Sequence, residues 1–438
     1  MGFLGMRGTG DWVEDQRPKS WRESILYLYP NGMAPLTAML SKMKSSAVTD
    51  PEFNWWTKTF PNRAGAITGV YTDAALSVSY TTGATEGSFL YIKMSEETVG
   101  HFRVGHQALL RDASDLTVDV VAVVMERVAN GTSSYLKVRL LEDDDNSTSG
   151  DLSDADRIIL LGNVNSEGAA MPDAISYDPV KWYNKTQIFR TPLEITGTAL
   201  ETKLRTNPQA YKELKREALE QHSTEMEWAF LHSVPSERIG ANGKPERTTL
   251  GIIPAIRGGY TGHGGAAGTV SDFTSDSTYS GHTWLSAGEA WLEEQLETIF
   301  RYGKKEKLMV CGTGVLMAIN KLVKNSGQFT FAPSVKVYGI DIMKWITPLG
   351  TINLLTHPML SQEVTTRHTG IIIEPENLHY RYIQNRDTKF IGEELGKTNT
   401  GYSRRDGKKE EFLTECGLEY HHPISWGYLS GFGSDNDA

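Results

Sequence analysis

The sequence predicts an α+β fold, and three stretches with different periodicities predict it. After Pro208, residues 209–232 contain no glycine or proline and repeat apolar side chains at spacings of three and four, which is typical of a long amphipathic helix. Residues 76–161 hold short apolar and β-branched runs bounded by turn residues, which indicates strands. Residues 307–324 begin with a buried strand and continue directly as a helix. The chain therefore combines helices with several groups of strands.

Length and composition exclude several classes of protein. The 438 residues suffice for about three domains, and the net charge of −10 argues against a protein whose main task is to neutralise nucleic-acid phosphates. Neither a run of 18 apolar residues nor a signal pattern occurs, so we expect no transmembrane helix and no export. Cys311 and Cys416 are too few for a disulfide framework, so we expect free thiols.

The first 52 residues contain little that could form a core. They are rich in polar residues, glycine and proline, with one short apolar run at residues 25–29. Because such a segment cannot bury itself, we expect it to lie on another surface, such as a neighbouring copy of the chain. Phe53, Trp55 and Trp56 then place three aromatic rings within four positions, a contact site more often found in a core than in a ligand site.

Residues 76–161 predict a small β-barrel or β-sandwich of its own. Strands are expected at residues 102–110, 117–128 and 135–141. Asn130-Gly131 between the last two is typical of a tight hairpin turn with positive φ at both positions. The acidic residues 142–151 lack the glycine and glutamate that an EF-hand loop needs at its sixth and twelfth positions, so a solvated loop is preferred to a calcium site.

A strand and a long helix stand at the centre of the sequence. Residues 183–189 show period-two alternation, with Ile188 on one side and Tyr183 and Phe189 on the other. Asn207-Pro208 supplies an N-cap and a first helical residue, and the helix to about His232 would be about 37 Å long. Its apolar stripe consists of Tyr211, Leu214, Ala218, His222, Met226, Ala229 and Phe230. Because its other face is charged, this helix is expected to be a long supporting element rather than part of a core.

Beyond this helix, the sequence predicts a second group of helices and strands. An amphipathic helix is expected at residues 284–302, and a hairpin turn at residues 347–350. Strands are expected in the tail at residues 369–373, 378–383, 411–419 and 426–429.

No constellation of residues predicts catalysis, a cofactor or a metal. The eleven histidines do not converge in the sequence, and His421-His422 lacks the i, i+4 spacing of a helical zinc site, so surface or packing histidines are preferred. Neither cysteine has a Cys-x-x-Cys partner, and the nucleophile-elbow and dinucleotide-binding patterns are absent from the sequence. We therefore expect neither an enzyme nor a cofactor.

Three stretches stand in a characteristic order along the chain. The first is GNVNSEG at residues 162–168, followed by WYNKTQIF at 182–189 and TGTA at 196–199; the second is residues 215–231, ending in RTTLGI at 247–252; the third is TECGLE at 414–419. In this order they resemble the major capsid proteins of tailed bacteriophages, whose shell fold is shared with encapsulins and the floor domains of herpesvirus capsids. The similarity spans most of residues 35–432.

The resemblance implies a division of the chain into the parts of that fold. Residues 1–52 would be the N-terminal arm, residues 53–195 the E-loop with a β-domain inserted at about 76–161, residues 196–232 the spine helix, residues 233–304 and 366–438 the peripheral domain, and residues 305–365 the axial domain. Contacts within or between subunits would be made by Phe53, Trp55, Trp56, Trp182, Tyr183, Ile188, Phe189, Ala218 and Met226.

The resemblance also implies a function and partners. The chain would be a structural protein that self-assembles into hexamers and pentamers of an icosahedral shell around the phage genome. It would contact portal, scaffolding or decoration proteins, touch DNA non-specifically on the inner surface, and avoid membranes. Its place would be the virion capsid, assembled in the host bacterial cytoplasm. Two alternatives stay open: a carbohydrate-binding or adhesion protein that uses the β-module, and a hydrolase that uses His421 or His422.

Overall fold

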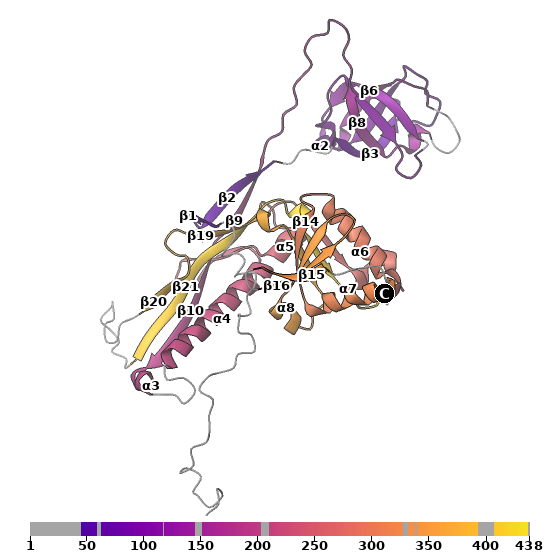
Figure 1. Ribbon diagram of the computed structural model, residues 1–438. Coiled ribbons are helices and arrows are strands. Elements are labelled where there is room, and N and C mark those ends of the chain that lie inside the picture. The colour runs from indigo at the N-terminus through magenta and orange to yellow at the C-terminus, as the bar shows by residue number, and fades with distance from the viewer. Residues whose placement is uncertain are drawn as a thin grey trace, which may run out of the picture. The chain divides into compact units, whose positions relative to one another are not determined.

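The computed structural model describes residues 45–58, 63–116, 118–144, 151–202, 210–326, 332–337, 340–392 and 407–436, which form an α+β fold as predicted. The chain divides into two compact units (Figure 1). We call Met1–Thr57 with Lys181–Ala438 the body, and Lys58–Val180 the barrel unit. The expected placement of residues 1–44 on a neighbouring copy lies outside the described residues.

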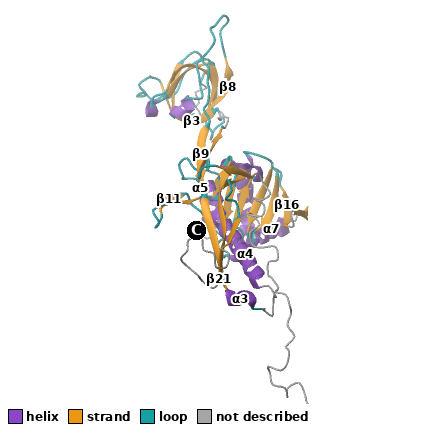
Figure 2. Cartoon of the chain, turned by 90° about the vertical axis from the view of Figure 1, so that its left-hand side faces the viewer, coloured by secondary structure: helices purple, strands orange, loops and turns teal. Residues whose placement is uncertain are grey.

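The barrel unit is built on a closed antiparallel β-barrel, shown from a second side in Figure 2. Around the barrel the strands are β3 (Ala64–Tyr71), β4 (Phe89–Met94), β7 (Tyr135–Leu140), β6 (Asp119–Val128), β5 (His106–Arg111) and β8 (Arg157–Asn163). The short helix α2 (Glu96–Val99) lies between β4 and β5 in the sequence. The barrel encloses its own hydrophobic core, which includes Leu90, Ile92, Phe102 and Leu136. The predicted small β-domain with an independent core is therefore confirmed.

Two details of the barrel differ from the sequence prediction. The barrel begins at β3 rather than near Leu76, because β3 carries two glycines and a register shift between Ile67 and Gly69 that hide its alternation. Between β6 and β7, Gly131 has φ 53° but Asn130 has φ −149°. A 3₁₀ turn, Gly131–Ser133, thus replaces the two-residue turn, although the hairpin itself forms.

Part of the acidic segment is buried rather than solvated, whereas Glu142 and Asp143 are exposed. Asp144 is 1 % exposed, accepts a hydrogen bond from the Tyr80 hydroxyl, and accepts a second from the backbone N–H of Leu152 at 3.3 Å. Burial and the neighbouring carboxylate raise the pKa of Tyr80 above its ordinary value. Residues 145–150 lie outside the described part of the chain, so the prediction of a solvated loop fails at Asp144.

The first sheet of the body contains the longest strand pairing. Its strands run in the order β1 (Ser45–Val48), β19 (Leu378–Ile383), β21 (Gly407–Tyr420) and β10 (Gln187–Thr196), and β20 (Lys389–Gly392) also pairs with β21. The antiparallel β10–β21 pair extends from Gln187 opposite Cys416 to Thr196 opposite Gly407. Helix α4 (Ala210–His232) contacts both strands and lies alongside them in Figure 1. The predicted long helix is confirmed.

The second sheet of the body is mixed parallel and antiparallel. Its strands run in the order β13 (Thr269–Asp272), β22 (Gly427–Ser430), β18 (Gly370–Ile373), β14 (Glu306–Cys311), β17 (Thr351–Thr356), β16 (Ile340–Ile346) and β15 (Ala332–Val337). Helices α6 (Trp284–Phe300) and α7 (Thr313–Ser326) share one hydrophobic core with this sheet. Trp284 and Trp291 of α6 meet Ile319 of α7 and Trp345 of β16 in that core.

This sheet joins segments that the resemblance implies to be peripheral and axial domains. Helix α6 was assigned to the peripheral part and residues 305–365 to the axial part, yet both contribute to one core. Strand β14 pairs in parallel with β17 and antiparallel with β18, so strands from both expected parts adjoin within one sheet. Sequence periodicity locates strands but contains no information on such crossovers.

Smaller elements complete the body. Strands β2 (Glu52–Thr57) and β9 (Val180–Lys185) form one two-stranded sheet, and β11 (Ser236–Ile239) and β12 (Pro245–Thr248) form another. The remaining helices are α3 (Gly197–Glu201), α5 (Ile252–Arg257) and α8 (Pro358–Gln362). In the part of the chain that is described, no helix has the length and apolarity needed to cross a membrane.

The barrel unit is expected to be removable without unfolding the body. The indole N–H of Trp182 donates a hydrogen bond to the Thr57 hydroxyl at 2.7 Å, so the two chain ends that lead to the barrel lie side by side. A short Gly/Ser linker in place of residues 58–180 therefore spans the gap. Circular dichroism and thermal melting of the shortened chain should show the α-helical signal and a cooperative transition. Loss of both would mean that the barrel is part of the body's core.

Candidate assembly surfaces

Helix α4 is joined to both strands of the long pair through one buried histidine. His222 is 1 % exposed, and its ring nitrogens hydrogen-bond with the hydroxyls of Thr191 on β10 at 3.0 Å and Thr414 on β21 at 2.7 Å. Burial lowers the pKa of His222, so the neutral imidazole is favoured. The histidine that the sequence places on the apolar stripe is thus a cross-link within the subunit.

Three of the predicted contact residues lie inside the subunit. Phe189, Ala218 and Met226 are 6 %, 5 % and 4 % exposed. The Phe189 ring meets Phe230 of α4 edge-on, with ring centroids 6.2 Å apart, and Phe230 meets Tyr380 of β19 at 6.3 Å. These side chains hold α4 against the first sheet, so they act through the subunit's own core.

Ile188 does not share the burial of its neighbour. Its exposed fraction is 50 %, because the alternation changes phase where β9 ends and β10 begins. Asn184 and Thr186 are buried before the break, whereas Phe189 and Thr191 are buried after it. The sequence predicts that Asn184, Thr186 and Ile188 share one face, and this prediction is wrong for Ile188. Ile188 instead offers an apolar group to the outside of the chain.

The aromatic run on β2 divides between the inside and the outside of the body. Phe53 and Trp55 are both 6 % exposed, and their rings stack with centroids 6.1 Å apart. Trp56 points the other way, as alternation on a strand requires, and is 62 % exposed. Of the three, Trp56 is therefore the one available to a partner.

Trp182 and Tyr183 anchor β9 within the body. Besides the Trp182 hydrogen bond to Thr57, the Tyr183 ring lies 4.0 Å from the His263 ring, measured between centroids. The backbone N–H of Tyr183 also donates to the carbonyl of Gly262 at 2.9 Å. Both side chains are half-buried, so their contacts serve mainly to fix the strand that leads from the barrel unit.

The β11–β12 hairpin is an exposed element that the sequence analysis did not identify. Every residue of β11 is exposed, including Ile239 at 80 %. Glu237 pairs with the ammonium of Lys185 and, at 3.1 Å, with Arg247. Because a two-stranded hairpin is marginally stable alone, a partner that covers this element would stabilise it. The overlooked sequence signal is Asn242-Gly243, a hairpin turn dipeptide in which Gly243 has φ 71°.

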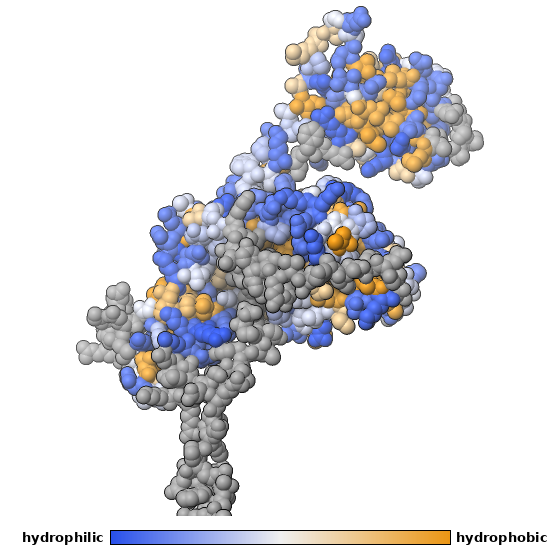
Figure 3. All heavy atoms as spheres, viewed as in Figure 1, coloured by the Kyte–Doolittle hydropathy of each residue, from blue (hydrophilic) through white to orange (hydrophobic). Residues whose placement is uncertain are grey.

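The barrel unit also presents apolar side chains to solvent. On the face shown in Figure 3, apolar groups gather over this unit. Val104, Met125, Val164 and Met171 are 41–94 % exposed and line a groove of about 830 Å³. Exposed apolar groups around a groove are typical of contact surfaces between proteins. The sequence does not predict this groove, because its lining residues come from separate strands and loops.

The two cysteines and the buried contact between Glu227 and His357 are structural. Cys311 and Cys416 are buried free thiols, as expected, and burial raises the pKa of Cys311 to about 12. Glu227 of α4 and His357, which follows β17, are completely buried and lie 2.6 Å apart, oxygen to nitrogen. This contact joins the long helix to the second sheet.

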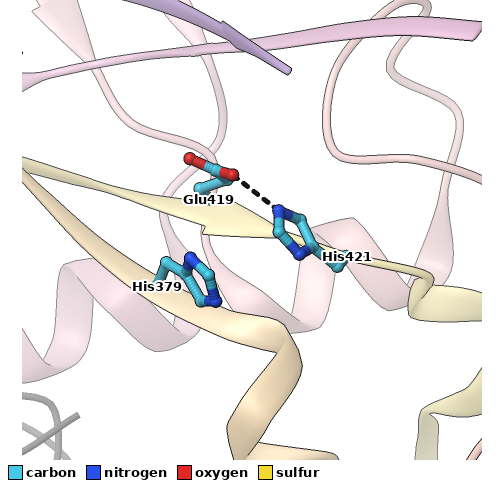
Figure 4. A group of neighbouring side chains, drawn as sticks. All are labelled: His379, Glu419 and His421. Carbon is cyan, nitrogen blue, oxygen red and sulfur yellow. Dashed lines mark hydrogen bonds and ion pairs between the residues drawn. The ribbon is translucent and has the colours of Figure 1, made fainter. Parts of the chain in front are cut away.

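One group of titratable side chains lies outside these packing contacts. His379 of β19, Glu419 of β21 and His421 lie close together at the surface of the first sheet, as Figure 4 shows. Nε2 of His421 is 2.5 Å from Oε1 of Glu419, and the Arg381 guanidinium donates to Oε2. Burial raises the pKa of Glu419, but the hydrogen bonds from His421 and Arg381 outweigh it and hold that pKa below its ordinary value. His422 is not part of the group.

Comparisons with known proteins place these features in context. A family model described as "SU10 major capsid protein" matches residues 8–432. The chain is 23 % identical to the major capsid protein of Pseudomonas phage PaMx41, over 98 % of this chain and 96 % of that one. Among solved structures, it is similar to the capsid of a native GTA particle, with 9 % identity, 98 % of each chain covered and a TM-score of 0.46. The SrpI encapsulin of Synechococcus elongatus PCC 7942 is similar over 60 % of this chain and 78 % of that one, with 11 % identity and a TM-score of 0.38.

Proposed function

The chain belongs to the family of SU10 major capsid proteins, and from this premise we propose how its parts build a phage shell. It is a structural protein of the virion capsid, not an enzyme, and it assembles with copies of itself. The observation that carries this conclusion is the family match over residues 8–432, nearly the whole chain. The carbohydrate-binding and hydrolase alternatives are not favoured, because the family is one of shell proteins.

The parts of the shell fold correspond to elements described above. The length of α4 and its contacts with β10 and β21 support its role as the spine helix. Residues 53–195 would form the E-loop with the barrel inserted at 64–163, and residues 1–52 the N-terminal arm. The second sheet with α6 and α7 would be the axial domain, and the first sheet the core of the peripheral domain. The core that α6 and α7 form with one face of the second sheet supports this division, although the other face of that sheet shares a core with the first sheet.

The surface of the single chain supports assembly into hexamers and pentamers. Trp56, Ile188 and Ile239 are each at least 50 % exposed, and β11 has no buried residue. Such groups are stabilised when obligate interfaces cover them, and those interfaces bury about 2,000–5,000 Å². We also propose that the chain contacts DNA non-specifically on the inner surface of the shell. It would further contact portal, scaffolding or decoration proteins and assemble in the host bacterial cytoplasm.

Assembly is expected to depend on the apolar side chain at the tip of β11. Ile239→Asp places a charge in a covered interface, which should raise the protein concentration needed for assembly about tenfold or more, a change of about 1.4 kcal/mol. The melting temperature of the unassembled chain should not change, because Ile239 is 80 % exposed there. Negative-stain microscopy and sedimentation velocity measure the yield of shells.

Ile239→Val serves as the matched control, since it keeps the apolar surface and should assemble like the wild type. Equal assembly by Ile239→Asp would exclude the hairpin from the subunit interfaces. A wild-type chain that stays monomeric at high concentration, with its own scaffolding proteins present, would contradict the shell proposal itself.

A further inference from the structure

The strand register brings His379, Glu419 and His421 to one face of the first sheet. His379 of β19 stands directly opposite Glu419 of β21. His421 follows Glu419 by two positions, so its side chain points to the same face. Its backbone N–H donates to the carbonyl of Asn377 at 2.8 Å, which continues the pairing beyond the end of β21. One potential ligand atom from each side chain lies within 4.8 Å of the other two.

We propose that His379, Glu419 and His421 form a binding site for a divalent transition-metal ion of the zinc class. Two imidazoles and one carboxylate are the protein ligands of many zinc sites that keep a fourth position for water. Imidazole nitrogen favours zinc, copper and nickel over magnesium and calcium, which prefer oxygen ligands. The two histidines are half-buried rather than enclosed, so an ion can reach them from solvent.

The hydrogen bond of the His379 ring decides which of its two nitrogens could bind a metal. Nε2 of His379 lies 3.2 Å from the carbonyl oxygen of Glu376. A carbonyl only accepts, so Nε2 carries the proton and Nδ1 carries the lone pair. A second ring nitrogen that donates to a carbonyl is a common feature of metal-binding histidines, because it fixes the tautomer and the ring orientation.

The carboxylate of Glu419 is oriented in a similar way. Arg381 holds its Oε2, which leaves Oε1 directed at the imidazole of His421. Binding would replace the proton shared by Nε2 of His421 and Oε1 of Glu419 with the metal ion, and that proton would pass to solvent. The guanidinium charge of Arg381 opposes the ion, so we expect an exchangeable site rather than a permanently loaded one.

The bound ion would clamp β19 to the end of β21. Strand β19 also pairs in parallel with β1, the first described strand of the chain. Metal binding would therefore stabilise the part of the sheet to which the N-terminal segment is attached. This role is independent of which subunit surfaces meet in the shell, so the two proposals fail separately.

Zinc titration of the full-length chain, first stripped with EDTA, tests the site. Isothermal titration calorimetry should show one zinc per chain, and Co²⁺ should give the visible absorption of a nitrogen- and oxygen-coordinated ion. His379→Gln and His421→Gln should each weaken zinc binding by at least about tenfold. Melting temperatures measured in EDTA show that the variants fold.

His422→Asn is the matched control, because His422 is the adjacent histidine but lies outside the cluster. It has φ 52°, a conformation that asparagine tolerates, and should bind zinc like the wild type. Equal zinc affinity in the wild type and in a folded His379→Gln/His421→Gln double variant would overturn the proposal. Equal displacement of zinc by Mg²⁺ and by Ni²⁺ would also overturn the proposal.

Discussion

Phe189→Ala is expected to lower the free energy of unfolding by about 3–5 kcal/mol, the usual cost of removing a buried phenylalanine side chain. Phe189 is 6 % exposed and lies between β10 and α4, where its ring meets Phe230. The cavity would open in the core that also holds Met226. Urea denaturation of the unassembled chain measures this loss, and the yield of shells should fall with it.

Ile188→Ala is the matched control on the same strand. Its side chain is 50 % exposed, so the free energy of unfolding should change by only about half a kcal/mol. Glu217→Gln, on the exposed face of α4, should have a similarly small effect. If Phe189→Ala and Ile188→Ala cost the same in the unassembled chain, the inward face assigned to β10 is wrong.

Lys307→Met is expected to destabilise the second sheet by about 3–5 kcal/mol, because it leaves the buried carboxylate of Glu374 without its partner charge. The two side chains are 0 % and 3 % exposed, and Nζ lies 2.5 Å from Oε1 of Glu374. The ammonium also donates to the carbonyls of Tyr302 at 3.1 Å and Ser425 at 2.9 Å. Burial lowers the pKa of Lys307 even though Glu374 opposes this shift. Urea denaturation again gives the change in free energy.

Two further variants separate charge from packing in this pair. Adding Glu374→Gln to Lys307→Met removes the unpaired charge and should recover part of the loss. Lys304→Met removes a lysine whose pair with Glu376 is exposed, with side chains 61 % and 69 % accessible, and should therefore destabilise the chain far less than Lys307→Met. A double variant less stable than Lys307→Met alone would show that an unpaired charge is not the cause.

Local periodicity in the sequence accounts for the elements that were predicted correctly. Helix α4 and the burial of Ala218 and Met226 follow from a stripe with a period near 3.6 residues, which requires no knowledge of the partner surface. The face of Ile188 was predicted wrongly because the alternation shifts by one residue at the break between β9 and β10. Such a shift moves every following side chain to the opposite face of the strand.

Features that depend on long-range pairing could not be read from the sequence. The meeting of His379 with Glu419 and His421 depends on the register between β19 and β21. The shared core of α6 and α7 depends on the order of strands in the second sheet. Neither register nor strand order follows from the spacing of residues within one element. The resemblance to capsid proteins supplied the function, and the domain boundaries that it implies stay predictions.

The central position of β21 has a consequence for synthesis of the chain. This strand, Gly407–Tyr420, pairs with β10, β19 and β20, all of which leave the ribosome before it. At about 5–20 residues per second, β10 waits for more than about ten seconds before its partner is made. A chain that stops early leaves the edges of β10 and β19 open, and open edges promote aggregation. The first sheet can therefore be completed only after nearly the whole chain has been synthesised.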